Sequence, residues 1–243
     1  MRGPTRRNHR VRDTHATAAR NMRSGESTFV SLPDGYLRGM ANALTALALN
    51  CTLKPSPQPS STEKLAGEVL AELASLGVSA DQLRVVDFDV RPGVTADEGD
   101  GDAWPRLRQR VVNADILVFA TPTWLGHMSS VAQRVLERLD AELSVTDDNG
   151  VKALTGKVAV PVVVGNEDGA HSIIAALAQA LNDVGYTIPA QGSTYWNGEA
   201  MQTVDYRMLE QQPPAVAATT KTAARNAFHV ASLLHARPYL PAV

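Results

Sequence analysis

Short apolar runs alternate with segments of helical periodicity along most of this chain. The apolar runs predict five strands, at residues 43–51, 83–90, 114–120, 157–164 and 186–194. Apolar residues recur at helical spacing in five further segments, at residues 65–76, 104–112, 131–139, 173–181 and 216–235. Because each strand is followed by a helix, we expect an α/β fold. We expect a doubly wound, five-stranded parallel sheet with helices on both faces, for which we take the strand order 2-1-3-4-5.

Charge is distributed unevenly along the sequence. Residues 1–40 hold eight Arg against three acidic residues and lack hydrophobic periodicity, so we expect a disordered basic extension. The net charge of this extension is +5. Because the net charge of the whole chain is −2, residues 41–243, the expected single domain, have a net charge of −7. A mildly acidic domain argues against nucleic acid as a partner.

Cysteine content and hydropathy exclude other classes of protein. Cys51 is the only cysteine, which rules out an internal disulfide and a cysteine-based metal site. No apolar run reaches the roughly 18 residues of a transmembrane helix. We therefore expect a cytoplasmic protein with no membrane partner. Pro161 lies inside the fourth predicted strand, where it removes a ladder donor, so we expect a bulge there.

Hydroxyl side chains follow the first predicted strand, at an edge where doubly wound proteins bind ligands. Ser60, Ser61 and Thr62 lie where the next helix begins, and free N–H groups at a helix N-terminus favour a phosphate. Thr52 and Lys54 follow the strand directly, and Lys54 adds a positive charge. The loop is neither a dinucleotide fingerprint nor a Walker loop. The alternative is that Ser60 is a simple N-cap and the other hydroxyls are solvated.

The loops after the third and fourth strands face the same edge. The first of them, 121–127, offers Trp124 for stacking, and His127 is the weaker ligand candidate. The second, 165–171, has two glycines that permit close backbone approach. The alternatives are that Trp124 packs in the core, that His127 caps a helix, and that 165–171 is an ordinary turn in which Asp168 caps the next helix.

The stretch 114–130, ADILVFATPTWLGHMSS, resembles the flavodoxin-like NAD(P)H-dependent FMN reductases and NAD(P)H:quinone reductases. The loop 52–62 is similar to their FMN phosphate loop, and 165–171 to their glycine-rich loop at the pyrimidine end of the flavin. The chain departs from the family in having Cys-Thr-Leu-Lys at 51–54 instead of Gly-Ser-x-Arg. It also has Trp124 where one quinone reductase type has Arg, and residues 196–243 match nothing recognisable.

This resemblance implies an FMN-binding oxidoreductase that takes a hydride from NAD(P)H. A small acceptor, namely a quinone, a nitro compound or free flavin, then receives the electrons. No catalytic side chain is needed, because the flavin carries the chemistry. Members of the family are often dimers or tetramers, so a homodimer or homotetramer is expected. The implied FMN contacts are Thr52, Lys54, Ser60, Ser61, Thr62, Thr121, Pro122, Thr123, Trp124, Leu125, Gly126, Gly165, Asn166 and Glu167.

Two other functions stay open at this point. One is a non-catalytic, flavodoxin-like electron carrier, although dedicated carriers are shorter and more acidic. The other is a regulatory or binding protein that has kept the fold and lost the flavin, which the departures at 51–54 permit.

Overall fold

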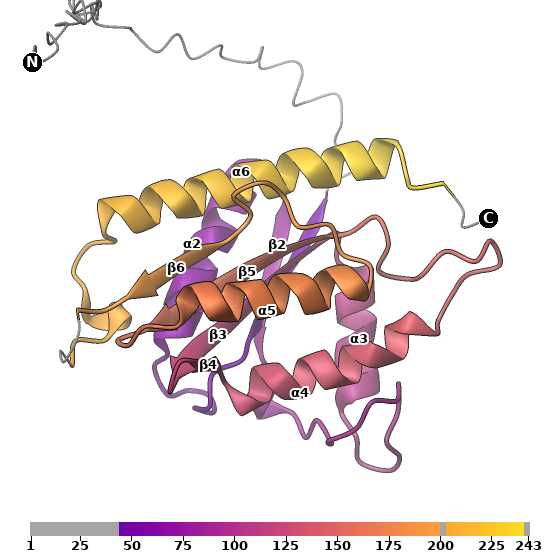
Figure 1. The fold of residues 1–243 in the computed structure, drawn as a ribbon, viewed down its shortest axis with the longest axis horizontal. Helices are drawn as coiled ribbons and strands as arrows, with labels where there is room; N and C mark the ends of the chain where they lie inside the picture. Colours follow the sequence, from indigo (N-terminus) through magenta and orange to yellow (C-terminus); the bar gives the residue numbers. More distant parts are fainter. Residues whose placement is uncertain (1–43, 200–202, 241–243) are drawn as a thin grey trace, which may run out of the picture.

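The computed structural model describes residues 44–199 and 203–240. The predicted basic extension 1–40 lies outside the described residues. The described part forms one sheet of five parallel strands in the order β2-β1-β3-β5-β6, and a two-residue strand, β4, pairs antiparallel with β3 (Figure 1). Counting only the parallel strands, this is the predicted order 2-1-3-4-5. The strands are β1 (Thr45–Asn50), β2 (Ser79–Arg84), β3 (Ile116–Trp124), β4 (His127–Met128), β5 (Val158–Gly165) and β6 (Thr194–Asn197).

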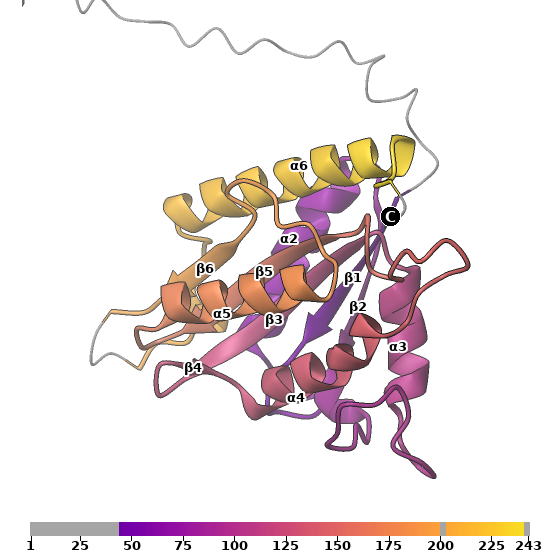
Figure 2. The same ribbon diagram turned by 45° about the vertical axis from the view of Figure 1, so that its right-hand side comes forward.

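Helices cover both faces of the sheet, as predicted. One face carries α2 (Ser61–Ser75) and α6 (Pro214–Ala236). The other carries α3 (Trp104–Asn113), α4 (Ser130–Leu139) and α5 (Ala170–Asp183) (Figures 1 and 2). The described part of the chain also contains three short 3-10 helices, η1 (Val85–Asp87), η2 (Asp140–Leu143) and η3 (Tyr206–Met208).

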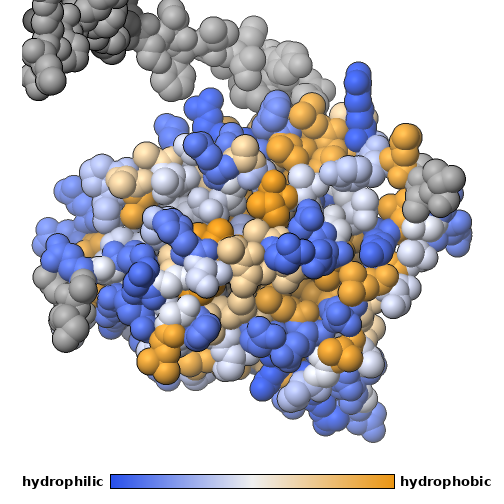
Figure 3. All heavy atoms as spheres, viewed as in Figure 1, coloured by the Kyte–Doolittle hydropathy of each residue, from blue (hydrophilic) through white to orange (hydrophobic). Residues whose placement is uncertain are grey.

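The two cores follow from the alternation of side chains along the central strands. In β3, Ile116 and Val118 pack under α2 and α6, whereas Leu117 and Phe119 pack under α3, α4 and α5. Every residue of β5 is buried, which is typical of a central strand in a parallel sheet. Outside these cores, the α4 and α5 side mixes apolar with strongly hydrophilic side chains (Figure 3). No helix of the described residues is long and apolar enough to cross a bilayer.

Three strand boundaries differ from the prediction. The second strand is 79–84 rather than 83–90, because its partner β1 ends at Asn50, opposite Arg84. The fifth is 194–197 rather than 186–194, and Thr187 alone makes an isolated bridge, to Val158. The third does not end at Ala120, because residues 121–122 pair with β5 and residues 123–124 with β4.

The expected bulge at Pro161 is wrong. Pro161 pairs in register with Phe119, and the β3–β5 ladder is continuous around it. The N–H of Ala159, two residues earlier, donates to Thr187 on the β6 side, so the missing N–H of Pro161 also faces that side. There the β6 partner begins only at Thr194, opposite Val162, and the absent donor therefore breaks no ladder.

Candidate functional site

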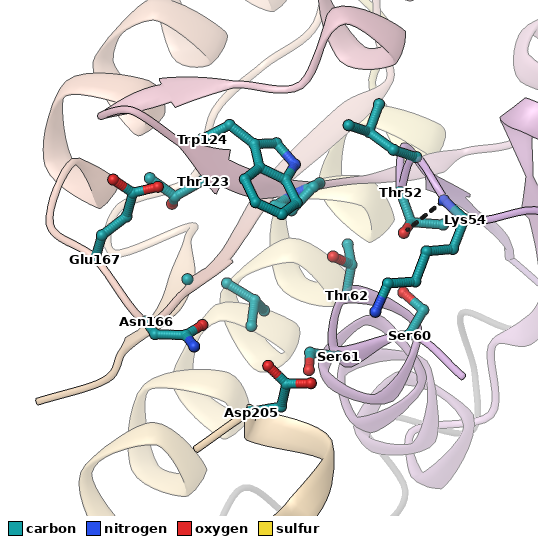
Figure 4. A pocket seen from close by; sticks show the side chains of 14 residues that line it. Thr52, Lys54, Ser60, Ser61, Thr62, Thr123, Trp124, Asn166, Glu167 and Asp205 are labelled. Atoms are coloured by element: carbon teal, nitrogen blue, oxygen red, sulfur yellow. Dashed lines mark hydrogen bonds between the residues drawn. The ribbon is translucent and has the colours of Figure 1, made fainter. Parts of the chain in front are cut away.

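A cavity of about 420 Å³ opens at the carboxyl edge of the sheet, within the size range of small-molecule sites (Figure 4). It lies between the loop after β1 on one side and the ends of β3 and β5 on the other, which is the predicted switch point. It is lined by Thr52, Leu53, Lys54, Ser60, Ser61, Thr62, Pro122, Thr123, Trp124, Val164, Gly165, Asn166, Glu167 and Asp205.

Three residues expected at the site do not line this cavity. Thr121 is buried, and its hydroxyl oxygen accepts the N–H of Ser129 (3.1 Å) where α4 begins. Leu125 and Gly126 form the turn between β3 and β4, and the Leu125 side chain is 88% exposed. Conversely, the cavity includes Leu53, Val164 and Asp205, which the sequence did not single out.

One end of the cavity is built by the N-terminus of α2. Ser60 is the N-cap, and its hydroxyl accepts the N–H of Glu63 (3.2 Å). Ser61 and Thr62 are the first two helical residues, and Lys54 extends its ammonium group towards them (Figure 4). The expected N-cap at Ser60 is thus confirmed, and the neighbouring hydroxyls line the cavity. Phosphate binding by this loop stays a prediction.

Arg84 of β2 holds the loop between β1 and α2 in place. It is 6% exposed, and its guanidinium donates to the carbonyls of Lys54 (3.1 Å) and Gln58 (2.7 Å). It also pairs with the Glu63 carboxylate (2.8 Å). The planar guanidinium of Arg84 therefore links the loop, at Lys54 and Gln58, to Glu63 in the first turn of α2. The sequence offered no signal for this role, since Arg84 lies in what was predicted as an ordinary strand.

Ser56 anchors the outer part of the same loop. Its N–H (2.8 Å) and its hydroxyl (2.6 Å) both donate to the Asp87 carboxylate. The hydrogen bond from the Ser56 hydroxyl, with a further contribution from its N–H and against some desolvation, lowers the pKa of Asp87. Asp87 is therefore ionised at neutral pH and keeps the loop tied to η1.

The opposite wall consists of Trp124 and Thr123. The Trp124 side chain is 52% exposed and points over the cavity (Figure 4), so its expected packing against a ligand is sterically open. The Thr123 hydroxyl is buried and has no hydrogen-bond partner among the described residues. A Cβ on Gly165 would lie 2.6 Å from the Thr123 Cβ, so only glycine allows β5 to approach this closely.

Two acidic residues, Glu167 and Asp205, also line the cavity. Glu167 accepts the N–H of Leu125 (2.9 Å), and Asp205 pairs with Arg207 (3.1 Å). The expected helix cap at Asp168 is wrong, since the N-cap of α5 is Gly169 and makes no side-chain cap bond. Asp168 accepts only the N–H of Gly169 (2.6 Å).

Asp205 reaches the cavity because the segment around η3 folds back onto α2. Lys64 donates to the carbonyls of Tyr206 (3.4 Å) and Leu209 (3.0 Å), and the Tyr206 hydroxyl donates to Glu68. Desolvation raises the pKa of Glu68, against the opposing effects of the Tyr206 hydroxyl and Lys64. No local sequence pattern predicts contacts across about 140 residues.

His127 does not cap a helix. It lies in β4 with an exposed side chain, and Ser129 caps α4 by accepting the N–H of Ala132 (3.1 Å). The Ser129 hydroxyl also donates to the carbonyl of Cys51 (2.6 Å), which joins the end of β1 to α4. Among the described residues, no group of histidine, cysteine and acidic side chains could hold a metal ion.

The strand order and the edge cavity define a flavodoxin-like α/β protein. Within that class, residues 44–201 match the family described as NADPH-dependent FMN reductase. The chain belongs to this family, and the resemblance noted from its sequence is confirmed.

Known relatives are more varied than the family description. The chain is 32% identical to 8-demethyl-8-aminoriboflavin-5'-phosphate synthase of Streptomyces davaonensis, over 81% of this chain and 80% of that protein. It is 40% identical over 163 residues to a Mycobacterium bovis protein named divalent metal cation transporter MntH. That match covers 65% of this chain and spans about a quarter (24%) of the relative.

Solved structures agree with this placement. The crystal structure of RosB with the bound intermediate 8-demethyl-8-formylriboflavin-5'-phosphate superposes with a TM-score of 0.75 at 31% identity, over 81% of this chain and 82% of RosB. The apo form of the NADH:FMN oxidoreductase EMOB gives 0.57 at 20% identity, over 81% of this chain and 92% of EMOB, a likeness of fold alone.

Proposed function

We propose that the chain binds a flavin 5'-phosphate, FMN, in the edge cavity and acts as an oxidoreductase. NAD(P)H is the electron donor, and a quinone, a nitro compound or free flavin is the acceptor. The observation that carries the proposal is the pairing of a phosphate-type end, Ser60 to Thr62 with Lys54, with an aromatic wall, Trp124, across one cavity. FMN when bound supplies the hydride and electron transfer.

The residues present fit this group. The first turn of α2 offers backbone N–H groups and the positive end of its dipole to a phosphate dianion. Ser61 accepts the N–H of Arg207 (3.3 Å) and still has its own O–H to donate. At the other end, the buried Thr123 hydroxyl is a polar group that gains a partner from a ligand.

Each side chain then has a positioning or electrostatic task rather than an acid–base one. Lys54 and the α2 hydroxyls orient the phosphate, and Trp124 covers the ring on one side. Arg84 holds the loop that carries Lys54. Gly165 allows the end of β5 to come close to Thr123.

Titration of the purified protein with FMN, followed by anaerobic addition of NADPH or NADH, tests the proposal. We expect one FMN per chain and loss of the yellow absorbance within seconds of adding the nucleotide. A chain that binds FMN but is reduced only by dithionite would be an electron carrier. A chain that binds no flavin would be a regulatory protein of the same fold.

A second function is favoured by the RosB comparison. That protein is named as a synthase of an aminoriboflavin phosphate and holds a modified flavin phosphate, and it superposes better than the reductase EMOB. In this alternative, the flavin phosphate in the cavity is a substrate whose ring substituent is changed. Mass spectrometry of flavin recovered after aerobic incubation with an amine donor distinguishes the two, because exchange of a ring methyl for an amino group needs dioxygen as oxidant as well as a source of nitrogen. An unchanged flavin mass contradicts the second function and leaves the first in place.

A further inference from the structure

We propose that Glu167 is a positioning residue, which holds Trp124 over the cavity by bracing the β3–β4 turn. This inference rests on the proposed function and deepens it. The Glu167 carboxylate accepts the N–H of Leu125, the residue directly after Trp124, at 2.9 Å. Through this bond the loop after β5 supports the turn at the end of β3.

The turn that carries Trp124 has an unfavourable backbone conformation. Leu125 has φ of 50° and Gly126 has φ of 77°, as in a two-residue turn with both central residues left-handed. Glycine and asparagine adopt this conformation readily, but leucine does not. Such strain persists only where surrounding contacts maintain it.

Besides this bond, strand pairing and the start of α5 support the turn. The Leu125 side chain is 88% exposed, and β4 contributes only the pairs Thr123–Met128 and Trp124–His127. Gly169, the N-cap of α5, gives a second support. A Cβ on Gly169 would lie 2.8 Å from the Cα of Gly126, so the turn packs directly against this loop.

The bracing loop is itself well anchored. It connects Gly165, the last residue of the fully buried β5, to Ala170, the buried first residue of α5. The backbone of the loop is therefore anchored at both ends, and the exposed Glu167 side chain extends from it to the N–H of Leu125. In Figure 4, Trp124 and Glu167 lie on the same side of the cavity, opposite Lys54.

The first experiment needs no ligand. The chain has three tryptophans, so 5-fluorotryptophan gives three ¹⁹F resonances, and Trp124→Phe assigns the relevant one. We expect Glu167→Ala to shift and broaden the Trp124 resonance and leave those of Trp104 and Trp196 in place. Glu167→Gln keeps an acceptor oxygen and should retain the native resonance. Asp168→Asn changes the neighbouring exposed carboxylate, which accepts only the N–H of Gly169, and is the matched control.

The second experiment measures FMN affinity in a double-mutant cycle. Glu167→Ala should weaken binding about tenfold, the effect expected for one hydrogen bond to a charged group. Glu167→Gln should restore the affinity to within about twofold. In the Trp124→Ala background, Glu167→Ala should weaken binding by less than about twofold, because its effect is exerted through Trp124.

Each contrary result has a distinct meaning. An unchanged Trp124 resonance in Glu167→Ala would overturn the brace, whether or not the protein binds FMN. A full tenfold loss in the Trp124→Ala background would also overturn it, since Glu167 would then contact the ligand itself. If wild-type protein binds no FMN, the proposed function fails, and the ligand-free resonance still decides the role of Glu167.

Discussion

At the scale of residues, the site depends on a few side chains with unusual surroundings. Lys54 brings an ammonium group to the α2 N-terminus, and Thr123 brings a buried hydroxyl without a partner in the described part of the chain. A Cβ on Gly165 would collide with Thr123, and a Cβ on Gly169 would collide with the backbone of Gly126. Each is decided by contact with a residue distant in sequence, so residue type alone does not reveal its importance.

Lys54→Met tests the phosphate end. It should weaken FMN binding about tenfold, because a charged contact to the phosphate is lost. Riboflavin has no phosphate, so its affinity should change less than about twofold. Isothermal titration with both ligands measures the ratio. Equal losses for FMN and riboflavin would show that the phosphate does not lie beside Lys54.

Gly165→Ala tests the close approach of β5 to Thr123. The new Cβ would lie 2.6 Å from the Thr123 Cβ, so one of the two strand ends must move. We expect a loss of about 1–3 kcal/mol in the free energy of unfolding, as for overpacking. Urea denaturation measures it. Stability equal to wild type would mean that the strand ends separate freely.

At the scale of elements, loops are fixed by partners on other elements. The loop after β1 is held by Arg84 of β2, and the segment around η3 is held by Lys64 and Glu68 of α2. The acidic loop before α3 is held by Asp102, whose carboxylate pairs with the fully buried Arg138 of α4 (2.7 Å). Each of these contacts joins a loop to an element distant in sequence.

Arg84→Met tests the first of these ties. Without its donors, the carbonyls of Lys54 and Gln58 lose their partners and the loop gains freedom. We expect faster hydrogen exchange of the amides of residues 52–60 and weaker FMN binding, with the exchange of β5 unchanged. Arg110→Met, which removes a more exposed pair with Asp81, is the control. Native exchange rates in residues 52–60 would contradict the role of Arg84.

Asp102 contributes to stability in a pH-dependent way. Burial disfavours its ionisation, but N–H groups of Glu98, Trp104 and Arg91 and the Arg138 guanidinium outweigh this and lower its pKa. Because the folded pKa lies below the unfolded value of about 3.9, this stabilisation is present above that pH. It is lost as pH falls through the folded pKa.

Asp102→Asn should therefore cost about 3–5 kcal/mol at pH 7, as for a broken buried ion pair. Denaturant unfolding at pH 7 and at pH 3 measures it, and the difference from wild type should shrink at the lower pH. Asp148→Asn, at an exposed carboxylate, is the control. A difference that is the same at both pH values would show that ionisation of Asp102 contributes nothing.

At the scale of the whole molecule, the sheet order brings three sequence-distant loops to one edge. The strand order places β1 and β3 side by side, with crossover helices on opposite faces, and so the loops after them diverge and leave a cavity. Asp205 reaches the cavity from the segment before α6, which runs along α2 on the same face of the sheet (Figures 1 and 2). The site is thus a product of topology as much as of the residues lining it.

Periodicity in the sequence predicted the α/β class and the helices α2 to α6, and the doubly wound arrangement supplied the strand order. The positions of the loops, together with the family resemblance, indicated most of the residues that line the cavity. These depend on local periodicity and on the rule that loops after parallel strands share an edge. Only the tertiary structure placed Asp205, Arg84 and the Leu125–Glu167 bond, and removed Thr121 from the cavity. Each of these is a contact between elements, set by how the elements pack and absent from any local pattern. Strand ends likewise follow their neighbours, since a strand extends only as far as a partner can bond to it.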